Sequence, residues 1–247
     1  MEQDIRTNPI AFRDSFLSEV SSSRVDKDYG AVLRVLLYYL WRGCSLSREA
    51  GITGKTDPKA SLISQSAYEA ILSIIQLIRI GYQVDAATLL RALMERIAII
   101  GYLGENRDFI PRYFEGKLAP YKEALSWAKK KSLPNWMILY STLSGVAHSR
   151  IEGPAGHINN RTTIGNAFRQ IPTRDPTKDS DMTEELLGLT VYSLLTLDSL
   201  ALGLIQNSNT KPFSNDPDIV HHVDLNDVKE FHNFLQRLVD RYGKYSK

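Results

Sequence analysis

The spacing of apolar residues limits the fold of this chain more than any other feature of its sequence. In Ala60–Ile80 and Val84–Leu103 apolar side chains recur every three or four positions, and Gly81 stands between the two segments. This spacing places the apolar side chains on one side of an α-helix, whereas a half-buried strand alternates them. Two long helices with a short joint form an antiparallel hairpin. The sequence therefore predicts an all-α protein, built as a single-domain helical bundle.

The rest of the chain follows the helical pattern with one interruption. Residues 1–59 are expected to add a helical extension to a core of residues 60–247, with helices at 11–20 and Tyr29–Trp41, a helix stop at Gly43 and a connection over Ser45–Lys59. Later helices are expected at Arg107–Phe114, Leu118–Lys131, Pro134–His148, Thr183–Gln206 and Leu225–Tyr242. Between about residues 151 and 180 three prolines mark a segment that is long for a loop. It forms a short strand pair, orders on binding or acts as a lid, and the sequence leaves these alternatives open.

Composition excludes several classes of protein. Hydrophobic residues make up 43% of the chain and the net charge is only +2, which indicates a globular protein without a general attraction to nucleic acids or membranes. Cys44 is the only cysteine, so an intramolecular disulfide and a zinc site with several thiolates are excluded. Residues 1–23 lack the apolar core of a signal peptide. We therefore expect a cytoplasmic protein.

One apolar segment has the length that a membrane span requires. Leu186–Ile205 contains a single charge, Asp198, and several hydroxyl groups, and no pair of aromatic or basic anchors flanks it. A central helix that its neighbours bury fits these features better than a membrane span does. No membrane partner is expected.

An arginine and a glutamate stand out on the most apolar helix of the first half. Arg91 and Glu95 are four residues apart, so one face of the helix carries both. Because burying charge is costly unless the charge is satisfied, the pair requires an explanation. One explanation is an internal ion pair that bonds to a neighbouring helix. The other is a polar site between helices, where bundles build their binding and catalytic sites.

A second candidate group surrounds His148, at the end of the helix predicted from Pro134. Ser144 lies one turn before His148, and Arg150 follows it closely. The helix dipole stabilises a protonated histidine at this position, which alone explains the residue. The functional alternative makes His148 a general acid or base, or a phosphate ligand assisted by Arg150. A Ser144–His148 nucleophile–base pair lacks a third group, and the other histidines are scattered, so we predict neither a metal nor a cofactor.

Lys129, Lys130 and Lys131 form a basic run between Trp127 and Trp136. The ordinary explanation of such a run is a solvated helix end. The alternative is a nucleic-acid-binding patch, in which lysines follow the phosphates and aromatic rings stack on bases.

Two phrases of the sequence carry a resemblance to known proteins. They are Asp85-Ala-Ala-Thr-Leu-Leu-Arg91-Ala-Leu-Met-Glu95 and Tyr140-Ser-Thr-Leu-Ser144-Gly-Val-Ala-His148-Ser. Over Ala60–Arg150 they resemble a bacterial family of uncharacterised helical proteins with a Leu-x-Arg-x-x-x-Glu helix and a later Ser-x-x-x-His. That family is distantly similar to the HEPN superfamily of helical ribonucleases and nucleotide-binding proteins. The resemblance implies a bundle, often a homo-oligomer, that serves in antiviral defence or toxin–antitoxin systems.

The chain departs from the HEPN pattern in its active-site motif. HEPN ribonucleases carry an arginine a short distance before the histidine, and His148 has no arginine there. Arg150 and His157 have that spacing, but Pro154 and two glycines between them disfavour a helix. Our hypothesis is a substitute site in which a neighbouring helix supplies Arg91 to His148, and which Glu95, Ser144 and Arg150 also line. In it, His148 moves a proton and Arg91 stabilises charge on phosphorus.

Two functions are consistent with these observations. The first is a metal-independent effector that cleaves RNA or binds a nucleotide. The second is a non-catalytic interaction or sensor subunit, in which residues 151–179 and the lysine run contact a partner protein.

Overall fold

The computed structural model of the protein describes residues 8–18, 23–116, 120–131, 140, 143, 180–205 and 217–242. Throughout these residues the regular elements are helices and there is no strand, which confirms the all-α prediction. The elements are α1 (Pro9–Ser18), α2 (Arg24–Ile52), α3 (Pro58–Arg79), α4 (Gln83–Glu105), η1 (Arg107–Phe109), α5 (Ile110–Phe114), α6 (Pro120–Lys130), α9 (Ser180–Ile205), η5 (Pro217–His221) and α10 (Leu225–Tyr242).

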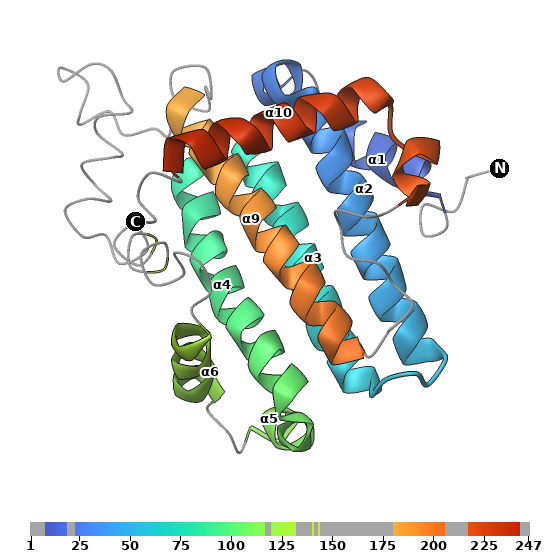
Figure 1. Cartoon of the computed structure of the whole chain (residues 1–247), viewed down its shortest axis with the longest axis vertical. Helices are drawn as coiled ribbons and strands as arrows, with labels where there is room; N and C mark the ends of the chain where they lie inside the picture. The colour runs from blue at the N-terminus through green and yellow to red at the C-terminus, as the bar shows by residue number, and fades with distance from the viewer. Residues whose placement is uncertain are drawn as a thin grey trace.

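Helices α2, α3, α4 and α9 lie side by side and form the bundle (Figure 1). The predicted hairpin of α3 and α4 is confirmed, and Gly81 in the joint has a positive φ of 86° that favours glycine. α4 and α9 run parallel, because their first residues and their last residues pair. The Gln83 amide donates to the Thr183 hydroxyl at 3.0 Å, and the Arg107 guanidinium donates to the Gly203 carbonyl at 2.8 Å. A parallel neighbour requires a long crossover, and the long interval between α6 and α9 in the sequence provides one.

The predicted end of the second helix is wrong. α2 continues through Gly43 to Ile52, so residues 45–52, expected to belong to a connection, are helical. A Cβ atom at Gly43 would lie 2.3 Å from Cζ of Tyr68. Gly43 therefore lets α3 approach α2 closely and does not stop the helix. The helix ends at Thr53, before Gly54 with its φ of 68°, and the predicted start at Tyr29 coincides with a kink in α2.

Asp198, the single charge of residues 186–205, pairs inside the bundle. Asp198 accepts a hydrogen bond from the Tyr68 hydroxyl at 3.3 Å and lies 3.7 Å from Nη1 of Arg42. Among the described residues, α3 and a Thr183–Leu204 stretch of α9 are long and apolar enough to cross a membrane, and the bundle buries about half of each. Apolar core helices of bundles have the same length and composition.

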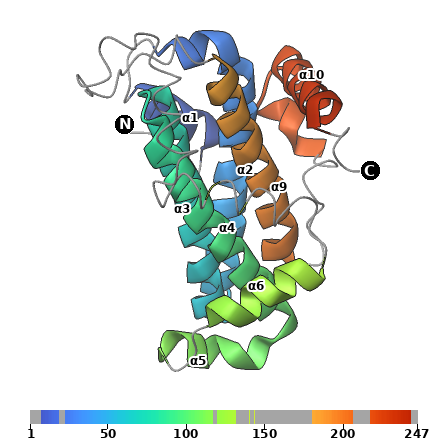
Figure 2. The same cartoon turned by 90° about the vertical axis from the view of Figure 1, so that its left-hand side faces the viewer.

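Helices α10 and α6 cover two different sides of the bundle (Figures 1 and 2). Arg34 of α2 holds α10 through two hydrogen bonds of 2.6 Å to Asp227. Phe231 and Phe234 of α10 are buried, and its Leu238 packs against Gly188 of α9. α6 lies against the second half of α4, as an outer layer.

Candidate functional site

Arg91 and Glu95 of α4 meet Tyr140, a residue far away in the sequence. Nη2 of Arg91 lies 3.0 Å from Oε1 of Glu95 and donates to the Tyr140 hydroxyl at 3.2 Å. The Tyr140 hydroxyl in turn donates to Oε1 of Glu95 at 2.9 Å. The guanidinium carbon also lies 5.5 Å from the centre of the Tyr140 ring, within the range of a cation–π contact. These three side chains, which we call the α4 cluster, form a closed triangle of polar contacts.

The α4 cluster is partly open to solvent. The side chains of Arg91 and Glu95 are 22% and 20% exposed, although their helix belongs to the core. Leu90, Leu93 and Met94, which alternate with them along α4, are buried. A charged pair at this depth is partly desolvated, which strengthens its electrostatic effect on a nearby ligand relative to an exposed pair. The predicted polar face of α4 is therefore present and reachable.

The structure describes two of the five residues of the sequence-predicted site. Arg91 and Glu95 are brought together as expected, while Ser144, His148 and Arg150 lie outside the described residues. Tyr140 was not predicted to join the site, although it opens the second phrase of the family resemblance and lies four residues before Ser144. Its helical backbone and that of Leu143, which is buried in the core, bring this part of the chain onto the bundle.

The lysine run divides into residues with different roles. All three lysines are exposed, and Lys131 also forms an ion pair of 2.7 Å with Glu105 at the end of α4. Trp127 donates its indole N–H to the same glutamate at 2.9 Å. The hydrogen bonds from Lys131 and Trp127 lower the pKa of Glu105. Lys131 is therefore part of the contact between α6 and α4.

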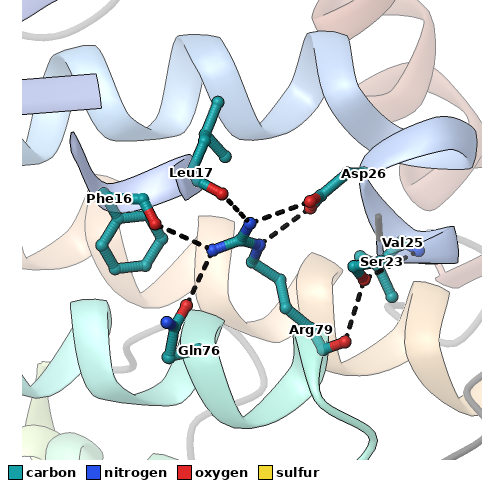
Figure 3. A network of polar contacts seen from close by, with 7 residues as sticks. All are labelled: Phe16, Leu17, Ser23, Val25, Asp26, Gln76 and Arg79. Carbon is teal, nitrogen blue, oxygen red and sulfur yellow. Dashed lines mark hydrogen bonds and ion pairs between the residues drawn. The ribbon is translucent and has the colours of Figure 1, made fainter. Parts of the chain in front are cut away.

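A second arginine, Arg79, is more deeply buried than Arg91. Figure 3 shows the polar contacts of its guanidinium group. Its side chain has no exposed surface, and it donates twice to the Asp26 carboxylate at 2.8 Å. It also donates to the Gln76 side chain and to the backbone carbonyls of Phe16 and Leu17, at 2.8, 3.1 and 2.9 Å. Every N–H of the guanidinium is thus used. Arg79 joins the end of α1 to α2 and α3, and this is a structural role.

Sequence reasoning missed Arg79 because a basic residue in the last turn of a helix is usually explained by the helix dipole. One signal was available. Ser23, the N-cap of α2, and Asp26 in the first turn of α2 are both polar. Arg79 ends α3, the helix that follows α2. In the structure the Ser23 hydroxyl accepts from the Val25 N–H and donates to the Arg79 carbonyl.

The partly buried Cys44 and the buried Tyr68 are excluded as nucleophiles by their environment. Burial raises the pKa of the Cys44 thiol from 9.0 to about 12, and the nearby Glu69 acts in the same direction. Burial and Asp198 raise the pKa of the Tyr68 hydroxyl well above its ordinary value. Both groups are therefore protonated at neutral pH. In the part of the chain that the structure describes, no three His, Cys, Asp or Glu side chains come close enough together to hold a metal ion.

Comparisons of the chain with protein-family models, with curated proteins and with solved structures found no match. The similarity to HEPN proteins therefore stays a prediction from the two sequence phrases.

Proposed function

We propose that this protein is a HEPN-like effector that acts on RNA or a nucleotide, with the α4 cluster as the anion-binding half of its site. The proposal is carried by one observation. Arg91 and Glu95 are held by Tyr140, and Tyr140 belongs to the sequence phrase that contains Ser144 and His148. The two phrases of the resemblance are thus joined by hydrogen bonds at the α4 cluster.

Each residue has a defined role in the proposed reaction. The 2′-hydroxyl of a ribose loses its proton and attacks the adjacent phosphorus, and the 5′-oxygen leaves with a proton. Arg91 stabilises the negative charge that develops on the phosphoryl oxygens. Glu95 and Tyr140 orient the guanidinium, because both are bonded to its Nη2 group. His148 is assigned the proton transfer, and Ser144 and Arg150 are assigned to phosphate binding.

A second function is favoured by the mutual pairing inside the cluster. Because Arg91, Glu95 and Tyr140 satisfy one another, the same contacts also serve to attach the Tyr140 segment to α4. In that case the protein is a non-catalytic interaction module. Arg91 is then a docking residue and not a catalytic one.

The two functions are distinguished by incubating the purified protein with mixed single-stranded RNA and comparing wild type with His148→Ala and Glu95→Gln. The control variant is His232→Ala, because His232 is exposed on α10 and distant in sequence from both phrases. The effector is supported if wild type and control cleave RNA and the other two variants lose at least a hundredfold in rate. Loss of a single catalytic group typically lowers the rate by about 10²–10⁴.

Nucleotide binding is measured on the same four proteins by calorimetry. If no protein cleaves RNA and none binds a nucleoside phosphate, the effector proposal is wrong. Stoichiometric co-purification of a partner protein by all four proteins would then favour the interaction module.

A further inference from the structure

The exposed face of α6 has a charge pattern that the proposed function does not use. Lys122, Lys129 and Lys130 are exposed, and so are Ser126 and Glu123. At about 100° per residue, the three lysines and Ser126 fall within one third of the helix circumference. The opposite side of α6 carries the buried residues Ala124, Trp127 and Ala128. Apart from Glu123 at its edge, the outward face is therefore cationic.

α6 is held in a fixed position on α4, as the outer helix in Figure 2. The Trp127 ring lies against Gly101, where a Cβ atom would come within 2.1 Å of it. The indole N–H and the Lys131 ammonium both bond to Glu105. These bonds engage Lys131, while Lys122, Lys129 and Lys130 are exposed on the outward face of α6. Docking fixes the backbone positions of these lysines, so a polyanion binds them without first having to order the helix.

Glu105, to which α6 is attached, and the α4 cluster lie on the same side of α4. Glu95 and Glu105 are ten residues apart, so their positions differ by about 15 Å along the helix axis. Around the axis, Arg91, Glu95 and Glu105 fall within about 80° of one another. A polymer that leaves the α4 cluster along this side of α4 therefore meets α6. A single nucleotide bound at the α4 cluster is too short to do so.

We propose that the α6 face formed by Lys122, Lys129 and Lys130 binds the phosphates of a single-stranded RNA whose reactive part lies at the α4 cluster. This inference rests on the proposed function. The ligand is assigned as RNA because it extends the proposed substrate. Lys122 and Lys129 lie about 10 Å apart along α6, so they can neutralise separate phosphates of one strand. The substrate class is thereby an oligonucleotide and not a free nucleotide.

The test measures the affinity of a labelled oligouridylate as a function of salt concentration, for wild type and for Lys122→Gln/Lys129→Gln/Lys130→Gln. The slope of log affinity against log salt becomes shallower by about 0.7 for each phosphate that the protein no longer neutralises. The slope of the triple variant is therefore expected to be smaller in magnitude than that of the wild type by about 2. Its affinity at low salt falls about tenfold or more. The matched control is Lys27→Gln/Lys55→Gln/Lys229→Gln, which removes three exposed lysines from α2, the α2–α3 turn and α10. The control keeps most of the wild-type slope.

A dinucleoside monophosphate separates this inference from the proposed function, because it does not reach from the α4 cluster to α6. The α6 variant is expected to cleave it at the wild-type rate and to lose only the long substrate. If no Arg91 variant changes the cleavage of either substrate, the proposed function fails while the binding result for α6 still stands. Equal slopes for wild type and the α6 variant overturn the inference, and so does equal weakening in the control. Competition by polyglutamate as strong as that by oligouridylate also overturns it, because the face then recognises any polyanion, including an acidic protein.

Discussion

The interior between α2 and α3 and the outer side of α4 hold an arginine in opposite ways. At the first, Arg79 has no exposed surface and uses all of its donors on one carboxylate, one amide and two backbone carbonyls. At the second, Arg91 keeps 22% of its side chain exposed and contacts one glutamate and one tyrosine. Burial with complete hydrogen bonding holds helices together, whereas partial burial leaves a charge in reach of a ligand. We therefore assign stability to the first region and chemistry to the second.

The largest effect on stability is expected from Arg79→Met. It leaves Asp26 and the carbonyls of Phe16 and Leu17 without their donor, and loss of one partner of a buried ion pair costs about 3–5 kcal/mol. Urea denaturation measures the change. Arg96→Met is the control, since Arg96 is exposed and bonds to the Ser66 carbonyl at 3.0 Å; it is expected to cost less than about 1 kcal/mol. Equal losses in both variants would show that burial does not distinguish the two sites.

Gly43→Ala tests how closely α2 and α3 pack. The new methyl group would meet the buried Tyr68 ring at 2.3 Å, and overpacking of this kind costs about 1–3 kcal/mol. At Gly203 of α9 a Cβ atom meets nothing within 4 Å, so Gly203→Ala is expected to stabilise the helix by up to about 1 kcal/mol. Thermal unfolding of the two variants should therefore shift in opposite directions. A stabilising Gly43→Ala would contradict the close approach of the two helices.

These residues also show what the sequence allows to be predicted. Apolar periodicity located α3, α4, α9 and α10, because each buries a continuous stripe of its own residues. It failed at Gly43, because glycine is common both where a helix ends and where two helices pack closely. Arg79 pairs with α1, and Asp198 pairs with Arg42, through tertiary packing. The spacing of residues within one helix does not predict such contacts. Arg91 and Glu95 were identifiable because they lie one helical turn apart in the sequence. Tyr140 was missed because it lies far from both in the sequence.

The thiol of Cys44 gives a smaller test of the closed interior. Because burial raises its pKa to about 12, the thiol stays protonated in the folded protein at neutral and mildly alkaline pH. Cys44 is only partly buried, so a thiol reagent at pH 8 is expected to react with it in the native protein, but more slowly than after denaturation. The folded pKa is raised, so this group's stabilising contribution is complete below pH 9.0 and is lost as the pH rises toward about 12. Equal rates of modification in the native and the denatured protein would contradict the raised pKa.

The smallest effect is expected at the exposed end of α4. The pKa of Glu105 is lowered by hydrogen bonds from Lys131 and Trp127, so its contribution to α6 docking is present above about pH 4.3, the unfolded value. It is lost as the pH falls through the lower folded pKa. Tryptophan fluorescence should therefore change at acid pH in the wild type, and the change should be reduced in Glu105→Gln. Identical acid titrations would show that this carboxylate does not hold Trp127.

Arg91→Lys tests the assignment of chemistry to the α4 cluster most directly, because lysine keeps the charge and loses the planar fork of donors. RNA turnover and the free energy of unfolding are measured on the same preparation. We expect turnover to fall by about 10²–10³, as for loss of a group that stabilises transition-state charge, while stability changes by less than about 1 kcal/mol. A variant that loses stability in proportion to its activity, or that loses stability alone, would contradict the account and make Arg91 a structural residue like Arg79.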